Sequence, residues 1–318
     1  MADPNLTPLQ FLQRYQNLKV NYFPSDGGAF QQFTGIKLRR YYINSSRKVV
    51  IKDLEDRIAA NKVDGLTKDE RRENRRLEGK IAHKKQSNKM QELVSKLKKG
   101  RTKDVRFTLQ EVRYGKGLPE DYELFLGLAA AAGMCDVGNG PPTRQSIQKF
   151  LDDSMMGIDC SGYVSAYYAA RGGIPESTID KVTRKGASSW GERRGNKKIT
   201  RVQDIRMGDC LVKVQRNGKL MPGIGHIMLA AGPGRADSSP TMEFKPLNVN
   251  SGKGGEYMGE SRGALYICES RGGGLKHGPA YFKDGFPNKR SPYFMIRRHG
   301  LAQWLRCIVV RPNFMTNR

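Results

Sequence analysis

The spacing of apolar and polar residues predicts a helical region in the first third of the chain. Apolar residues recur at helical spacing between Val49 and Val63, and Asp64-Gly65 supplies a turn after them. A capping-box pattern at residues 67–70 then starts a second amphipathic segment. Two helices joined by a glycine turn predict a hairpin over about residues 50–99.

The pattern changes after about Leu118 to mixed helix and strand. Apolar runs of strand length follow one another through the second half of the chain, each bounded by glycine, proline or polar residues. These runs cover residues 210–214, 227–231, 265–268, 293–296 and 307–310. A helical block followed by successive strands predicts an α+β fold with an antiparallel sheet.

Composition narrows the class of protein. With 318 residues, 37% of them hydrophobic and 27% charged, the chain has the profile of a soluble globular protein. No apolar run approaches the roughly 20 residues of a membrane span, so none is expected. The first ten residues lack a basic stretch followed by an apolar core, which predicts no secretory signal and synthesis in the cytoplasm.

The net charge of +25 implies an anionic partner such as nucleic acid, an acidic membrane or an anionic polymer. The predicted hairpin at 50–99 contains basic runs such as RRENRR, and these runs have two interpretations. Its basic residues either form the solvated face of a docking or oligomerisation arm, or they bind nucleic acid. Charge runs alone do not decide between the two.

Five cysteines are widely separated, an odd number without a CxxC pair. This spacing argues against a disulfide scaffold or a zinc site, so reduced thiols are expected, with no metal and no cofactor. Cys210, Cys268 and Cys307 fall within apolar strand-like runs and are expected to be ordinary core residues.

Cys160 differs from the other cysteines, because it lies in the stretch Asp159-Cys160-Ser161-Gly162 ahead of an apolar run. Apolar positions after it recur at three-and-four spacing, which places Cys160 where a helix begins. The partial positive charge of a helix N-terminus favours a thiolate, and small neighbours admit a substrate. Cys160 is therefore the candidate nucleophile.

A base and an orienting group are also present among strand-like segments. Alternation puts His226 on one face with Met228, beside a glycine, and makes His226 the candidate base. Glu269 is the candidate third residue, although it is nearly as well explained by an ion pair with Arg271. His277, in glycine-rich surroundings that suggest a loop, is the rival orienting group. The remaining two histidines, at positions 83 and 299, do not have a catalytic context.

Five sequence blocks in order resemble the NlpC-type cysteine hydrolases over roughly residues 120–311. The blocks are IDCSGYV (158–164), GGIP (172–175), IRMGDCLVKV (205–214), GHIMLAAG (225–232) and YICESRGGG (266–274). The resemblance implies a papain-like α+β fold in which a helix carrying the nucleophile packs on an antiparallel sheet. It matches Cys160 to the nucleophile, His226 to the base and Glu269 to the variable third position, and gives Asp209 a structural role.

Taken together, these features predict a basic, mainly helical N-terminal region over 1–115 and a hydrolase domain over 116–318. Two departures from the family are the absence of a Tyr and Trp-Gly-Gly segment before the cysteine and a long insert at 233–263. A third is a glutamate where many relatives have histidine.

The expected activity is cleavage of amide bonds in peptidoglycan stem peptides by a thiol protease or amidase. The setting is either an effector toxin exported without a signal, with a secretion partner, or a cell-wall-degrading lysin in a phage particle, with an assembly partner. Two alternatives stay open: deamidation or acyl transfer on a protein or lipid, and a non-catalytic protein that binds nucleic acid.

Overall fold

The computed structural model describes residues 3–22, 24, 29–41, 47–60, 105–135, 140–172, 186–192, 195–221, 225–232, 263–271, 274–282, 293–298 and 301–313. The chain divides into two compact units, Tyr15–Gly157 and a second unit made of Met1–Arg14 together with Ile158–Arg318. The predicted division into a helical region over 1–115 and a hydrolase domain over 116–318 stays a prediction. Within the described ranges, no helix has both the length and the apolar content needed to cross a membrane.

The unit Tyr15–Gly157 is mainly helical. Its elements are β1 (Leu18–Tyr22), β2 (Gln31–Ile36), β3 (Arg40–Tyr41), α2 (Arg47–Ala60), α5 (Val105–Arg113), α6 (Pro119–Ala131) and α7 (Arg144–Asp153). Helix α6 forms its core, since the Tyr122 ring is fully buried and packs edge-on against Tyr15. The Asp121 carboxylate caps the start of α6 by accepting from the backbone N–H of Leu118 at 2.8 Å.

Helix α2 corresponds to the start of the predicted basic hairpin. The helical pattern predicted from Val49 is present, and the helix continues through Ala60. The rest of the hairpin, from residue 61 to 99, lies outside the described residues.

The second unit is built on antiparallel strands. They are β5 (Lys197–Ile199), β6 (Cys210–Lys213), β7 (Ile227–Ala230), β8 (Gly263–Arg271), β9 (Gly274–Phe282), β10 (Phe294–Arg298) and β11 (Trp304–Arg311). The short β4 (Gly157–Ile158), the helices α1 (Pro8–Tyr15), α8 (Cys160–Ala170) and α10 (Ser188–Glu192), and the 3₁₀ turn η1 (Val202–Asp204) complete the described elements.

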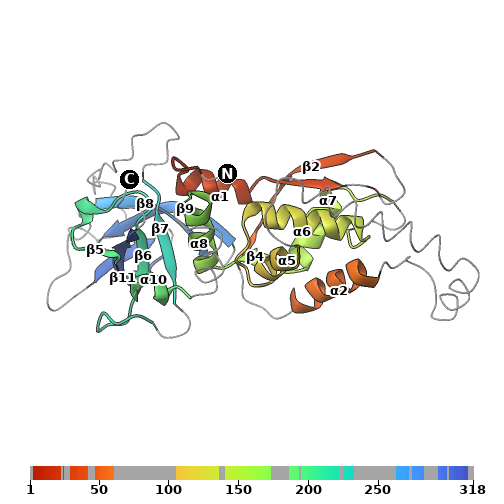
Figure 1. Ribbon diagram of the computed structural model, residues 1–318. Helices are drawn as coiled ribbons and strands as arrows, with labels where there is room; N and C mark the ends of the chain where they lie inside the picture. Colours follow the sequence, from red (N-terminus) through yellow and green to blue (C-terminus); the bar gives the residue numbers. More distant parts are fainter. Residues whose placement is uncertain are drawn as a thin grey trace, which may run out of the picture. The chain divides into compact units, whose positions relative to one another are not determined.

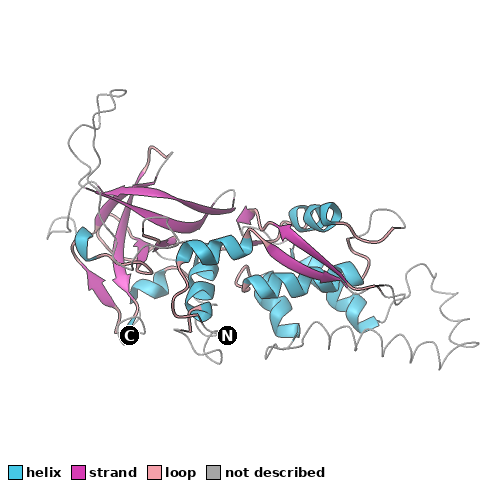
Figure 2. Cartoon of the chain, turned by 90° about the horizontal axis from the view of Figure 1, so that it is seen from above, coloured by secondary structure: helices cyan, strands magenta, loops and turns pink. Residues whose placement is uncertain are grey.

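The strands close into a ring. Their order is β10-β9-β8-β7-β6-β11, and β10 pairs with β11 as well as with β9, so that Ile296 lies opposite both Phe282 and Leu305. All these pairings are antiparallel, and β5 adds to β11 outside the ring. The strands curve around one another, with α8 beside β7 and β8 (Figure 1, Figure 2).

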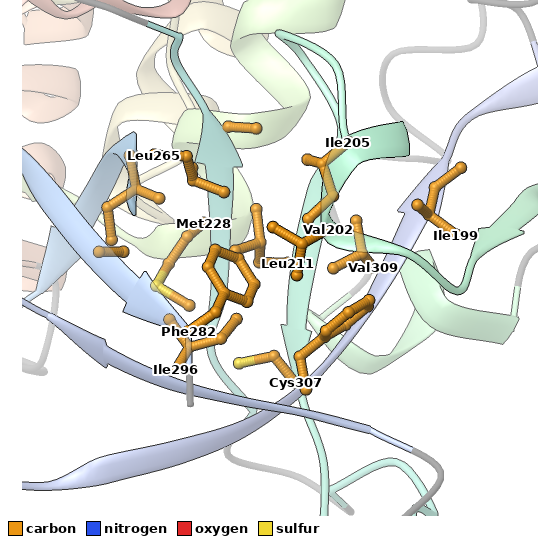
Figure 3. Close-up of a cluster of buried hydrophobic side chains, with 14 of the residues drawn as sticks. Ile199, Val202, Ile205, Leu211, Met228, Leu265, Phe282, Ile296, Cys307 and Val309 are labelled. Atoms are coloured by element: carbon orange, nitrogen blue, oxygen red, sulfur yellow. The ribbon is translucent and has the colours of Figure 1, made fainter. Parts of the chain in front are cut away.

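Inward-pointing side chains fill the ring. Leu211, Met228, Phe282, Ile296 and Val309 meet there, contributed by five different strands and all fully buried (Figure 3). Each alternates along its strand with residues that face away from the ring. The result is a closed six-stranded barrel with a side-chain core.

The predicted fold class, a papain-like α+β fold with a helix packed on an antiparallel sheet, is therefore wrong. The strand-like runs form strands, but the sheet closes because β10 is bonded on both sides, whereas an open sheet leaves two edges. Strand β9 was also not predicted. Its glycine-rich sequence around His277 suggested a loop, yet it pairs with β8 along its whole length.

Candidate active site

Helix α8 begins at Cys160, as predicted. Asp159 is its N-cap, with extended backbone angles (φ −83°, ψ 168°), and its carboxylate accepts hydrogen bonds from the Gly162 N–H and from Ser161 Oγ. The helix is almost entirely buried because apolar and small residues occupy all its faces over the first nine positions. Cys160, the first helical residue, is thus held at the positive end of the helix dipole.

His226 lies directly before β7 and faces the inside of the barrel. It is two residues before Met228, so alternation puts both side chains on one face, as predicted, and because Met228 belongs to the barrel core that face is the inner one. Its carbonyl accepts from the Lys213 N–H at 2.9 Å, which fixes the backbone to β6. The Cys160 Sγ lies 3.9 Å from the carbonyl oxygen of the preceding residue, Gly225.

Glu269 is the partner of the imidazole. Its Oε2 lies 2.6 Å from His226 Nε2, and its side chain is only 3% exposed. The same oxygen accepts from Arg298 Nη1 at 2.8 Å, while Oε1 forms an ion pair with Arg271 Nε at 2.7 Å. Two interpretations of Glu269 follow from the sequence, as a partner of the imidazole and as an ion-pair partner of Arg271. Both contacts are present, because Oε2 contacts His226 and Oε1 contacts Arg271.

Charge and burial oppose each other at His226. Burial lowers the pKa of this imidazole, but hydrogen bonds and charge interactions with Cys160 and Glu269 outweigh it and raise the pKa from 6.5 to about 9. The imidazolium form is thus favoured at neutral pH. With Nε2 directed at the carboxylate, Nδ1 is the ring nitrogen that remains for the thiol of Cys160.

Glu269 is held as a carboxylate by its neighbours. Burial raises the pKa of this carboxyl, and the hydrogen bond and charge of His226 together with Arg298 reverse that effect and lower it below its ordinary value. An ionised, buried carboxylate is a strong acceptor for the Nε2–H of an imidazole. The arrangement can therefore orient the ring and stabilise its positive charge.

His277, the rival orienting group, is not part of this cluster. It lies in strand β9 opposite Cys268, whereas Glu269 lies opposite Lys276, so His277 and Glu269 point to different faces of the β8–β9 pair. Its ring stacks on Tyr266 with centroids 5.2 Å apart. Burial lowers its pKa, which favours a neutral ring. His83 and His299 lie outside the described residues.

Arg298 is a site residue that the sequence reasoning missed. A signal was present, because Arg298 follows Phe294 and Ile296 at alternate positions and so falls on the buried face of β10. The sequence pattern marked only the apolar run 293–296 of that segment, as a strand. Its partner, Glu269, belongs to β8, which is separated from β10 by β9, and the two residues come together because both strands pair with β9.

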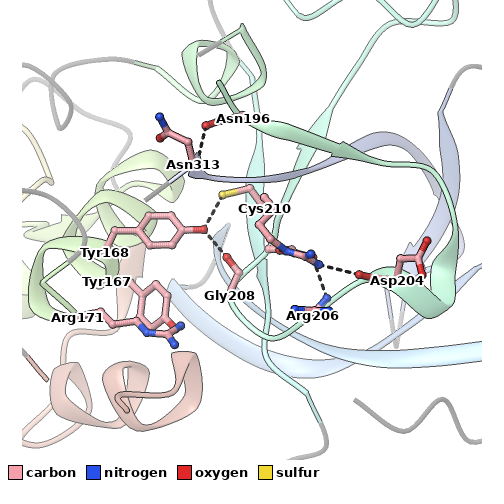
Figure 4. A network of polar contacts seen from close by, with 11 residues as sticks. Tyr167, Tyr168, Arg171, Asn196, Asp204, Arg206, Gly208, Cys210 and Asn313 are labelled. Atoms are coloured by element: carbon pink, nitrogen blue, oxygen red, sulfur yellow. Dashed lines mark hydrogen bonds and ion pairs between the residues drawn. The ribbon is translucent and has the colours of Figure 1, made fainter. Parts of the chain in front are cut away.

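Asp209 has the structural position expected of it. It is fully buried and binds Arg311 through two hydrogen bonds of 2.8 Å, and Arg311 also donates to the Asp204 carbonyl. Nearby, the hydroxyl of Tyr168 on α8 bonds to the Gly208 carbonyl and lies 3.1 Å from Cys210 Sγ (Figure 4). These contacts attach α8 and β11 to the turn before β6.

The other cysteines fit the prediction of core residues. All five cysteines are free and buried, and burial raises the pKa of Cys268 and Cys307 to about 12. Burial also raises the pKa of Cys210. These thiols are protonated at neutral pH. In the parts of the chain that are described, no three His, Cys, Asp or Glu side chains gather as a metal site would require.

No protein-family model, curated protein or solved structure was found to match this chain. The resemblance to the NlpC-type hydrolases stays a prediction from the five sequence blocks.

Proposed function

We propose that this chain is a cysteine hydrolase that cleaves amide bonds with Cys160 as nucleophile, His226 as base and Glu269 as orienting group. The observation that supports this most directly is the position of His226, whose Nε2 lies 2.6 Å from the carboxylate of Glu269 and whose pKa is raised by hydrogen bonding and charge interaction with Cys160 and Glu269. A nucleophile, a base and a group that orients the base are the parts that such chemistry needs. The chemistry depends on this site and not on a papain-like scaffold.

The reaction has two stages. The Cys160 thiolate attacks the amide carbonyl and forms a C–S bond, while the backbone N–H groups of the first helical turn stabilise the oxyanion. His226 gives its proton to the leaving nitrogen as the C–N bond breaks, which leaves a thioester. His226 then takes a proton from water, the resulting hydroxide attacks the thioester, and the carboxylic acid product leaves as the C–S bond breaks.

For the substrate we propose peptidoglycan stem peptides. The support is the resemblance of the sequence blocks to cell-wall hydrolases and the net charge of +25, which favours binding to an anionic wall polymer. In this proposal the protein reaches the wall either as an exported effector or in a phage particle. Of the described site residues, Arg271 is the most exposed arginine, at 27%, and contributes to the positive charge around the thiol.

Incubation of purified peptidoglycan with the full chain tests the proposal. Wild type is expected to release peptides with new carboxyl and amino ends, Cys160→Ala to release none, and Cys135→Ala, which removes a thiol outside the site, to behave as wild type. Release by Cys160→Ala would refute the thiol mechanism.

Reactive Cys160 without wall cleavage would instead favour deamidation or acyl transfer on a protein or lipid. An unreactive Cys160, together with nucleic-acid binding that weakens steeply with salt, would favour the non-catalytic alternative.

A further inference from the structure

Arg298 contacts both members of the proposed base pair. Its Nη1 lies 2.8 Å from Glu269 Oε2 and 3.5 Å from His226 Nε2, and its side chain is 13% exposed. His226, Glu269 and Arg298 each lie two positions beyond a core residue of their strand, respectively Met228, Ile267 and Ile296. The antiparallel register brings these three strand ends to the same end of the barrel. The three polar side chains therefore form one layer on top of the apolar core.

We propose that Arg298 is a positioning residue of this site, which keeps Glu269 ionised and its Oε2 directed at His226. The inference rests on the proposed function. The resemblance of the five sequence blocks does not indicate this role, because Arg298 lies C-terminal to all five blocks.

The hydrogen-bonding capacities of the three groups support this role. An ionised carboxylate only accepts and a guanidinium only donates, so Nε2, which lies 2.6 Å from Oε2, must carry a hydrogen and donate it to that oxygen. Oε2 accepts from both Nε2 and Arg298 Nη1 when Glu269 is ionised. This arrangement places the proton of the neutral imidazole on Nε2, which leaves Nδ1 to take the proton of Cys160.

Electrostatics supports the same role. A carboxylate as buried as Glu269 would take up a proton at higher pH without a fixed cation beside it. The approach of Arg271 Nε to Oε1 is an ion pair without the alignment of a hydrogen bond, whereas Arg298 is an aligned donor. Arg298 is thus the stronger of the two arginine contacts, and it acts on the oxygen that His226 uses.

Several other ionisable groups lie around Glu269 and Arg298, on α8, β6, β8, β9 and β11. Cys160 on α8 acts through His226, Arg271 is on β8 itself and Lys276 lies opposite Glu269 on β9. On β11, Cys307 faces both Glu269 and Arg298, but its pKa of about 12 keeps it a neutral thiol. Lys213 on β6 faces Cys307. None of these is an aligned donor to Oε2 among the described residues.

The test is alkylation of Cys160 by iodoacetamide in the full chain, followed by peptide mass spectrometry at about pH 5 and about pH 8. Loss of one charge-assisted hydrogen bond to Glu269 is expected to lower the labelling rate of Arg298→Met about tenfold at the lower pH. At the higher pH the carboxyl is ionised in both proteins, and the rates are expected to agree within about twofold. Arg298→Lys, which keeps the charge, is expected to recover most of the rate at the lower pH.

Arg297→Gln is the matched control, because Arg297 lies opposite Trp304 on the other face of β10 and its guanidinium is over that ring. It is expected to label as wild type at both pH values. If Arg298→Met labels as wild type at the lower pH, or loses the same factor at both pH values, the inference is overturned while the proposed hydrolase stands. If Cys160 of the wild type reacts no faster than Cys135, the proposed function fails, and the inference fails with it.

Discussion

Replacing Glu269 by Gln tests how strongly the carboxylate controls the imidazole. The substitution keeps the shape of the side chain but removes the charge that lies 2.6 Å from His226 Nε2. Burial by itself lowers the pKa of His226, so its value of about 9 depends on Glu269 and Cys160. In the variant the pKa of His226 is expected to fall.

The magnitude follows from the shift. The rise from 6.5 to about 9 corresponds to roughly 3 kcal/mol of preference for the imidazolium in the folded state, at about 1.4 kcal/mol for each pH unit. A charge-assisted hydrogen bond contributes about 1.5 to 3 kcal/mol, so Glu269 accounts for a large share. Because the folded-state pKa is raised, this stabilisation is fully present below pH 6.5 and is lost as the pH rises through about 9.

Urea unfolding of the full chain between pH 6 and pH 10, followed by tryptophan fluorescence, measures this effect. Both tryptophans, Trp190 and Trp304, lie in the barrel unit, so the signal reports the unit that holds the site. The buried thiols Cys268 and Cys307 lower the stability of both proteins near pH 10, so the expected result is a difference: the free energy of unfolding of wild type falls by up to roughly 3 kcal/mol more across this range than that of Glu269→Gln. Nuclear magnetic resonance titration of the His226 ring provides a direct second measurement.

His277→Gln is the control, because His277 lies on the other face of the β8–β9 pair and has a lowered pKa. The free energy of unfolding of this variant is expected to decline with pH as it does in wild type. Glu269→Gln also leaves Arg298 and Arg271 without a counter-charge and so lowers stability at every pH. Only the slope with pH therefore carries the test, and a slope equal to that of wild type would refute the coupling between Glu269 and His226.

Three further outcomes are expected from the same structure. Asp209→Asn, which breaks the buried pair with Arg311, should lower the free energy of unfolding by about 3 to 5 kcal/mol in urea titrations; a loss below about 1 kcal/mol would contradict the structural role. Asp159→Ala removes the N-cap of α8 and should lower the free energy of unfolding by about 1 kcal/mol. It should also slow the alkylation of Cys160, and an unchanged labelling rate would show that the cap does not support the thiolate. Cys268 and Cys307 should resist alkylation in the native protein at pH 8 and react only in denaturant, and rapid native labelling of either would contradict their burial.

The sequence alone determined the features that depend on local spacing. Three-and-four spacing after Asp159 predicted a helix that begins at Cys160, and the helix does begin there. Alternation in the GHIML segment predicted that His226 shares a face with Met228, and alternation also put Glu269 in phase with Ile267. These predictions hold because the direction of a side chain along a helix or strand is fixed by backbone geometry within a few residues.

Only the tertiary structure decided how these pieces combine. The pairing of β10 with both β9 and β11 closes the barrel, and nothing in the apolar run of either strand distinguishes a closed ring from an open sheet. The strand around His277 was missed because its glycines match a loop locally, while its hydrogen bonds to β8 come from a neighbouring strand. Arg298 reaches Glu269 across β9, which pairs with both of their strands, so their contact depends on strand pairing and not on the spacing of residues along the chain.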